Sequence, residues 1–98
     1  MASLAYDRRA LQDLDRLTDF LLAEDAAAAE EVLLIIHSAL EALKLHPLLG
    51  RPIRRDAREL VISHGNTGYI ALYHYRKGAD HVQVRAIRHQ RQAGFEAD

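Results

Sequence analysis

The imidazole of His89 is the side chain in this sequence best suited to acid–base chemistry near neutral pH. It lies at the end of residues 82–89, where apolar and polar side chains alternate as in a half-buried strand. This alternation would place Gln83, Arg85, Ile87 and His89 on one strand face, so that Arg85 and His89 could point together. A histidine that ends a strand usually forms only a local hydrogen bond, and we favour that plainer role for His89.

The histidines do not form a recognisable metal-binding pattern. Six histidines are present, but none are spaced as His-x-His or His-Glu-x-x-His. The chain has no cysteine, which excludes thiolate ligands and disulfides and suits a reducing cytoplasm. We therefore expect neither a metal nor another cofactor.

Charge is unevenly distributed along the chain, although the net charge is only −1. Residues 1–50 carry four basic and nine acidic side chains, whereas residues 51–91 carry nine basic and three acidic ones. Most such asymmetries reflect two solvated surfaces. The preference for arginine over lysine in the second half favours a binding surface. One guanidinium group can form two parallel hydrogen bonds with a partner and can stack on flat groups. For Arg88 and Arg91 we weigh solvation and partner contact equally.

Three tyrosines, Tyr69, Tyr73 and Tyr75, share one face of a predicted strand. An aromatic stripe of this kind can stack on nucleic acid bases. More often it belongs to the core, with hydroxyls that reach the edge of the core. We expect the core role here.

The first half of the sequence predicts two helices. Leucines recur at helical spacing after Asp7, a plausible N-cap, and a second apolar stripe runs from Val32 to Leu43. Leu34 and Ile35 widen the second apolar stripe, which suggests that this helix is covered on more than one side. A connection of about three residues predicts an antiparallel helical hairpin. Pro47 ends the second helix near His46.

The second half predicts strands. Residues 47–55 have the proline and glycine content of a loop, and strands are expected at 60–62, 69–75 and 82–89. Short turns between them imply antiparallel neighbours, and residues 3–6 could add a short N-terminal edge strand. The predicted fold is therefore a single α+β domain over residues 1–98, with an N-terminal helical hairpin packed on a small antiparallel sheet. Without a signal peptide or a membrane-spanning apolar run, we expect a cytoplasmic protein.

Five segments in this order resemble the RelE/ParE toxin superfamily, also known as plasmid stabilisation proteins. The resemblance covers nearly the whole chain. The matching segments are 9–14 (RALQDL), 46–52 (HPLLGRP), 58–62 (RELVI), 68–73 (GYIALY) and 86–95 (AIRHQRQAGF).

The resemblance implies the toxin of a toxin–antitoxin pair, neutralised by a small cognate antitoxin encoded beside it. ParE-like members inhibit DNA gyrase, whereas RelE-like and YoeB-like members cut messenger RNA on the ribosome. A YoeB-type site uses glutamate, arginine and histidine, for which Glu59, Arg85 and His89 are the candidates here. RelE-like members resemble one another in their lysines, a strand arginine and a terminal tyrosine. This chain has only two lysines, has no arginine within residues 69–73 and carries Phe95 near its end.

We therefore expect a ParE-like toxin that inhibits DNA gyrase without catalysis. Its expected target-binding residues are Arg85, Arg88, His89, Arg91 and Phe95. The alternatives are a ribosome-dependent endoribonuclease and an inactive remnant that binds only its antitoxin. The antitoxin would form a hetero-oligomer with the toxin, by adding a strand to an open sheet edge or by laying a helix in a groove beside the helical hairpin.

Overall fold

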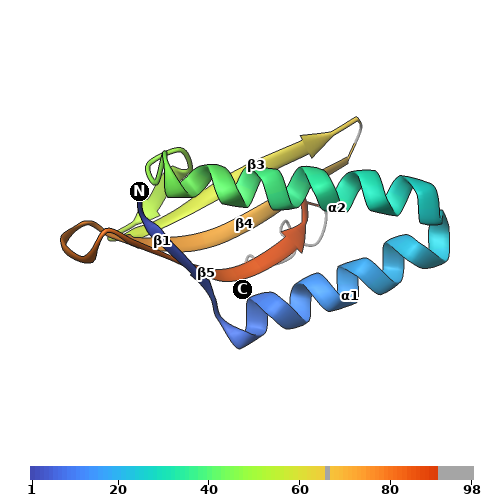
Figure 1. The fold of residues 1–98 in the computed structure, drawn as a ribbon, viewed down its shortest axis with the longest axis horizontal. Coiled ribbons are helices and arrows are strands. Elements are labelled where there is room, and N and C mark those ends of the chain that lie inside the picture. Colours follow the sequence, from blue (N-terminus) through green and yellow to red (C-terminus); the bar gives the residue numbers. More distant parts are fainter. Residues whose placement is uncertain (66, 91–98) are drawn as a thin grey trace.

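The computed structural model describes residues 1–65 and 67–90, which form two α-helices packed on a five-stranded sheet (Figure 1). This confirms the predicted α+β class, the N-terminal helical hairpin and the short N-terminal edge strand. In chain order the elements are β1 (Ser3–Tyr6), α1 (Arg8–Glu24), α2 (Ala26–Glu41), the 3-10 turn η1 (Ala42–Lys44), β2 (Arg51–Arg54), β3 (Ala57–His64), β4 (Thr67–Arg76), the 3-10 turn η2 (Lys77–Ala79) and β5 (His81–His89).

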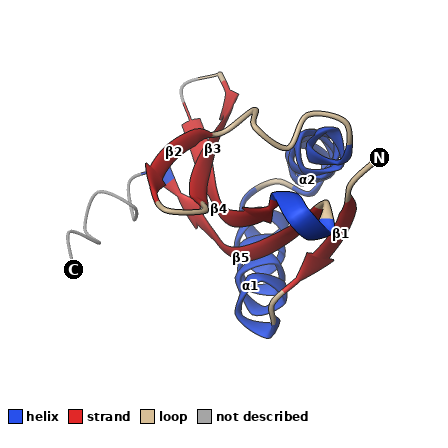
Figure 2. Ribbon diagram, turned by 90° about the vertical axis from the view of Figure 1, so that its left-hand side faces the viewer, coloured by secondary structure: helices blue, strands red, loops and turns tan. Residues whose placement is uncertain are grey.

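The sheet is mixed rather than wholly antiparallel. Its strand order is β1-β5-β4-β3-β2, and the pairs from β2 to β5 are antiparallel. The first strand, β1, pairs in parallel with β5, the last one. The sequence predicted β1 but not this direction, because pairing between the two ends of a chain leaves no local turn signal. The two α-helices cover one face of the sheet, and no described α-helix covers the other, open face (Figure 2).

The helices follow the predicted apolar spacing. In α2, Ala29, Val32, Ile36 and Leu40 are buried, and Leu34 is 64% exposed, so the expected covering on more than one side is wrong at that position. Asp25 alone joins the two helices, where about three residues were expected. Its backbone N–H closes α1, and its carboxylate accepts hydrogen bonds from the N–H groups of Ala27 and Ala28 to begin α2. No helix among the described residues is long and apolar enough to cross a membrane.

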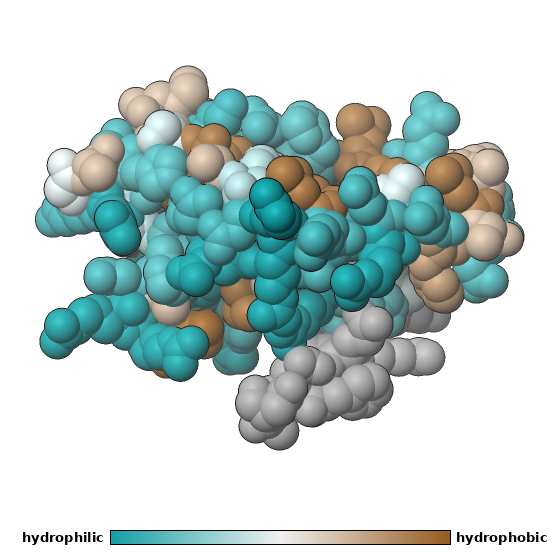
Figure 3. All heavy atoms as spheres, turned by 90° about the horizontal axis from the view of Figure 1, so that it is seen from below, coloured by the Kyte–Doolittle hydropathy of each residue, from teal (hydrophilic) through white to brown (hydrophobic). Residues whose placement is uncertain are grey.

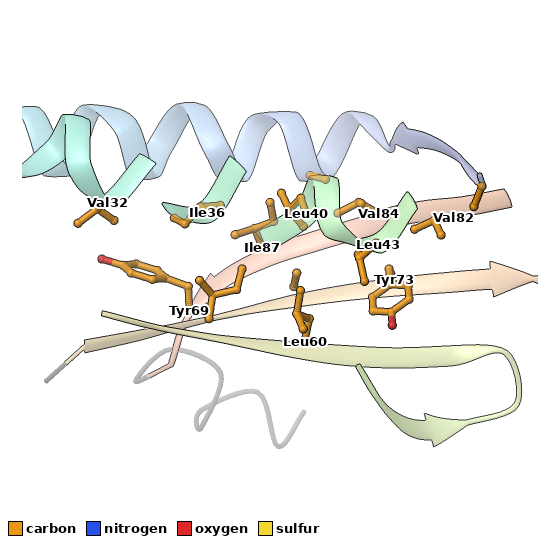
Figure 4. Close-up of a cluster of buried hydrophobic side chains, with 14 residues drawn as sticks. Val32, Ile36, Leu40, Leu43, Leu60, Tyr69, Tyr73, Val82, Val84 and Ile87 are labelled. Carbon is orange, nitrogen blue, oxygen red and sulfur yellow. The ribbon is translucent and has the colours of Figure 1, made fainter. Parts of the chain in front are cut away.

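The core lies between α2 and the sheet, as Figure 4 shows. The tyrosine stripe belongs to this core, as predicted: Tyr69 and Tyr73 are buried, and Tyr75 packs against the core from its edge. The other labelled side chains of this core are Val32, Ile36, Leu40, Leu43, Leu60, Val82, Val84 and Ile87.

The strand β2 was not predicted, because residues 47–55 were interpreted as a loop. All four of its residues are exposed, so it has no alternating apolar pattern to detect. It pairs only with the first residues of β3, and the pairing is irregular between Pro52 and Arg54.

A β-bulge in β5 overturns the predicted alternation of that strand. Tyr73 pairs with Val84, but its neighbour Leu72 pairs with Ala86, so Arg85 is an extra residue without a partner in β4. Beyond the bulge the inward positions shift by one, and Ile87 joins Val84 in the core. The prediction that Gln83, Arg85, Ile87 and His89 share a face is therefore wrong.

Candidate functional site

Arg85 lies at the centre of a polar cluster on the sheet face that points away from the helices. Its Nε donates to Oδ2 of Asp7 at 2.5 Å, and its Nη1 lies 3.3 Å from Nδ1 of His74. The other carboxylate oxygen of Asp7 accepts from the amide of Gln83 at 2.7 Å. These four residues, the Arg85 cluster, join β4, β5 and the end of β1. Asp7 lies at the predicted N-cap of α1, but its side chain makes no capping hydrogen bond and binds the cluster instead.

Hydrogen-bonding rules fix most protons along this cluster. Arginine can only donate, so Nδ1 of His74 is unprotonated and Nε2 of its neutral ring carries the proton. The amide nitrogen of Gln83 donates to Asp7, which leaves its oxygen to accept from Nε2 of His81 at 2.8 Å. Nδ1 of His81 also forms a 2.6 Å hydrogen bond with the hydroxyl group of Ser3.

The cluster shifts the pKa values of two of its members. The hydrogen bond from Gln83, reinforced by Arg85, lowers the pKa of Asp7, which therefore remains a carboxylate. Partial burial, followed by the nearby charge of Arg85, lowers the pKa of His74. A cation and a neutral imidazole thus lie together on the open sheet face at neutral pH.

Glu59, Arg85 and His89, the candidates for nuclease catalysis, are not brought together. Glu59 binds Arg51 of β2 through a 2.6 Å hydrogen bond and is largely shielded. Glu59 of β3 pairs with Leu72 of β4, and Leu72 pairs with Ala86 of β5. Two strand spacings, about 10 Å, therefore separate the backbone of Glu59 from the bulge in β5. His89 packs edge-on against the core residue Tyr69, with ring centroids 5.3 Å apart.

The expected target-binding residues divide between the two sheet faces. Arg85 lies on the open face, 48% exposed. Arg88 is half-buried and pairs with Ile70, whereas His89 pairs with Tyr69, so these two neighbours point to opposite faces. Arg91 and Phe95 lie outside the described residues.

Three of the motif segments meet at one loop. Tyr73 is fully buried, and its hydroxyl accepts from the N–H of Gly50 at 2.8 Å and donates to the carbonyl of Pro47 at 2.7 Å. Arg58 donates to the carbonyls of Gly50, at 2.6 Å, and Leu48. A Cβ on residue 50 would lie 2.7 Å from the Tyr73 ring and 2.8 Å from the carbonyl of Glu59, so only glycine fits there. The loop of residues 47–50 is therefore held by two side chains.

A fourth motif closes part of a sheet edge. The strand β1 covers β5 only as far as Val84. Beyond it, the N–H of Ile87 donates to Oδ2 of Asp13 on α1 at 2.9 Å. Asp13, from the RALQDL segment, thus replaces a missing strand partner at this edge.

The sequence did not indicate the partners of Arg85 or the hydrogen-bonding roles of Tyr73 and Asp13. The residues of the Arg85 cluster are distant in sequence, so no spacing rule connects them. A signal for the bulge was present, because Ala86 and Ile87 are consecutive apolar residues that interrupt the alternation. Among the described residues no three histidine, aspartate or glutamate side chains are grouped as a metal site.

Within the described residues, two kinds of surface remain open for a partner. Beyond β2, no described strand pairs with the outer edge of β3 from Leu60 to His64. The helices also expose large apolar side chains, among them Phe20 at 58% and Leu34 at 64%. Figure 3 shows apolar patches among hydrophilic side chains, several of them toward the end where α1 meets α2.

Comparison with known proteins identifies one family. Residues 4–94 match the sequence model of the ParE toxin of the type II toxin–antitoxin system parDE. The chain is 37% identical over 89 residues to Toxin RelE3 of Caulobacter vibrioides (strain ATCC 19089 / CIP 103742 / CB 15). This alignment covers 91% of this chain and 95% of that protein. It is 31% identical over 74 residues to Toxin RelE1 of the same strain, over 76% of this chain and 80% of that protein.

Two solved structures share the fold. The chromosomal ParDE system from P. aeruginosa superposes with a TM-score of 0.74 at 20% identity, over 91% of this chain and 96% of that one. The intact E. coli RelBE toxin–antitoxin complex gives a TM-score of 0.54 at 17% identity, over 90% and 95% of the two chains.

Proposed function

Because the chain belongs to the ParE toxin family of type II toxin–antitoxin systems, we propose that it inhibits DNA gyrase by binding to it. A protein that traps its target needs a surface rather than a catalytic group. The observation that carries this proposal is the dispersal of Glu59, Arg85 and His89 over two strands and two sheet faces. Catalysis requires reacting groups within hydrogen-bonding reach of one substrate atom, and these three do not meet that condition.

The proposed gyrase contact is the last part of the chain. It comprises Arg85 on the open sheet face, Arg88 and His89 at the end of β5, and Arg91 and Phe95 beyond the described residues. Arginine can bind carboxylates and phosphates bidentately, which suits an enzyme target that itself holds DNA. The bulge at Arg85 supports this assignment, because bulges commonly redirect side chains beside functional surfaces.

The proposed partner in the resting state is a cognate antitoxin in a hetero-oligomer within the cytoplasm. Membership of a toxin–antitoxin family supports such a partner, and so do the structural neighbours ParDE and RelBE. The open edge of β3 and the exposed apolar side chains of the helices are the places where an added strand or helix would bury apolar surface.

A supercoiling assay tests the proposal directly. Purified toxin is titrated into DNA gyrase and relaxed plasmid, with and without the protein encoded by the adjacent reading frame. We expect inhibition that this partner relieves, and weaker inhibition by Arg85→Ala than by Arg16→Ala, which removes an exposed arginine from α1. Full supercoiling in excess of folded toxin would rule the proposal out.

A second candidate, a ribosome-dependent endoribonuclease, is favoured by the pairing of Arg85 with a neutral His74. These two groups could stabilise a phosphate and move a proton on the open face. This candidate predicts codon-linked cuts in translating extract that disappear in Arg85→Ala. If the toxin causes neither inhibition nor cuts, and its expression does not slow growth, the chain is an inactive remnant that only binds its antitoxin.

A further inference from the structure

A cleft of about 660 Å³ lies beside the loop that follows α2 and η1. One wall is formed by residues 45–49, and the opposite side by the β2–β3 turn and the end of β4. Tyr73 and Arg58 hold the loop wall through hydrogen bonds to Pro47, Leu48 and Gly50. The cleft is therefore preformed, and a ligand would not have to order its wall.

The loop wall of the cleft is apolar and exposed. Leu45 is 65%, Leu48 60% and Leu49 54% exposed, although all three belong to a short segment fixed against the core. Three large apolar side chains held in water beside one concavity are typical of an interaction site.

The other side of the cleft is basic. Arg54 and Lys77 line it, and neither forms an ion pair with another described residue. Asp56 is the one acidic residue in the lining, and Arg58 adds a third cation. An apolar wall opposite two available cations is complementary to a chain that carries both apolar side chains and carboxylates.

We propose that this cleft binds an acidic, leucine- or phenylalanine-bearing peptide segment of the antitoxin. The inference rests on the proposed function only in taking the antitoxin as the partner. Nucleic acid fits less well, because its phosphates would leave the leucine wall in water. The described lining offers only Tyr75 and the imidazole of His46 for base stacking.

The cleft is separate from the Arg85 cluster. Tyr75 lines the cleft, and His74 belongs to the cluster; as consecutive residues of β4 they point to opposite faces of the sheet. Neutralisation and target binding would therefore use different faces, and changes in the cleft should affect the first without the second.

The test compares cleft variants with matched controls. The variants are L48S/L49S, its milder form L48S, and the charge reversal R54E/K77E. The controls are Ile53→Ser, which alters an exposed apolar residue of β2 that does not line the cleft, and Arg16→Glu on α1. Each folded toxin is titrated by calorimetry with the protein from the adjacent reading frame and with overlapping synthetic peptides of it. Circular dichroism melts establish that each variant folds.

We expect the cleft variants to bind the antitoxin at least about ten-fold more weakly, and the controls to change its affinity by less than about three-fold. One acidic, apolar peptide should bind the wild type and lose binding to R54E/K77E. Unchanged affinity in folded L48S and R54E/K77E would overturn the proposal. The proposal would also be overturned if the cleft variants bound the antitoxin normally but no longer arrested growth, because the cleft would then be a target surface. It would likewise be overturned if the variants lost self-association, because a second copy of the chain would then be the occupant. Because these readouts do not involve gyrase, a negative supercoiling assay would leave this inference standing.

Discussion

At the scale of single residues, Tyr73 contributes through its hydroxyl as well as its ring. The hydroxyl is buried and satisfies one donor and one acceptor of the loop, at Gly50 and Pro47. Burial raises the pKa of this phenol, which therefore stays protonated and able to donate across the physiological range. The three motif segments that contain Tyr73, Gly50 and Arg58 thus share one structural role, which is to hold the loop of residues 47–50 in place.

Tyr73→Phe should lower the free energy of unfolding by about 1–3 kcal/mol, because it leaves a buried N–H and carbonyl without their partner. Urea denaturation measures the change. Tyr75→Phe is the matched control, since its hydroxyl binds the exposed carboxylate of Asp80 and its loss should cost less than about 1 kcal/mol. Equal stability of the two variants would contradict the role given to Tyr73.

His74 should titrate below its ordinary pKa of 6.5, because burial and Arg85 disfavour its charged form. The unfolded chain then binds more protons than the folded one. Stability from this residue is complete above pH 6.5 and falls as the pH drops from there through the lower folded pKa. The lowered pKa of Asp7 acts in the same direction at still lower pH, below its ordinary value of 3.8.

An NMR titration of the imidazole checks this prediction. Arg85→Ala should raise the pKa of His74, because the facing cation is removed, whereas Arg16→Ala should leave it unchanged. A pKa at or above 6.5 in the wild-type protein would show that the Arg85 cluster is not formed in solution.

At the scale of elements, β5 depends on a side chain where it lacks a neighbouring strand. Asp13→Ala should expose the N–H of Ile87 and lower the free energy of unfolding by about 1–2 kcal/mol. The more specific readout is amide hydrogen exchange, which should accelerate at Ile87. Asp15→Ala, on the exposed side of α1, is the control. Unchanged protection at Ile87 would mean that Asp13 does not close this edge.

A helix or strand could be predicted where its own residues carry an apolar pattern, and could not where only pairing with a distant segment defines it. Both helices and the strands β4 and β5 were predicted from periodic apolar patterns, and β3 was predicted from the apolar run at residues 60–62. The strand β2 exposes all four residues and contains Pro52, so only its pairing with β3 defines it. In the candidate site, Arg85 was proposed from its residue type and strand position, but its partners come from elsewhere: His74 from β4 and Asp7 from between β1 and α1. Their distances from Arg85 depend on tertiary packing.

At the scale of the whole molecule, acidic and basic residues are concentrated in different halves of the sequence, and the fold places these halves on different surfaces. The acidic residues are concentrated in α1 and α2, and the cleft beside β2 is basic. We expect the association rate with the antitoxin to fall as salt rises from about 0.05 to 0.5 M, while the dissociation rate changes little, because screening acts mainly on encounter. Stopped-flow mixing measures both rates, and R54E/K77E should flatten the salt dependence. An association rate that does not vary with salt would exclude electrostatic steering.

The bulge at Arg85 sets the sheet face of each residue that follows it in β5. A substitution at position 85 changes one side chain and leaves every later residue on its own face of the sheet. Deletion of the same residue would close the bulge and leave Ala86 opposite Leu72 and Ile87 opposite Ala71, so the later residues would also keep their faces. The bulge therefore lets β5 lose the residue at position 85 without reversing the faces of the residues that follow, although the Arg85 cluster would be lost with it.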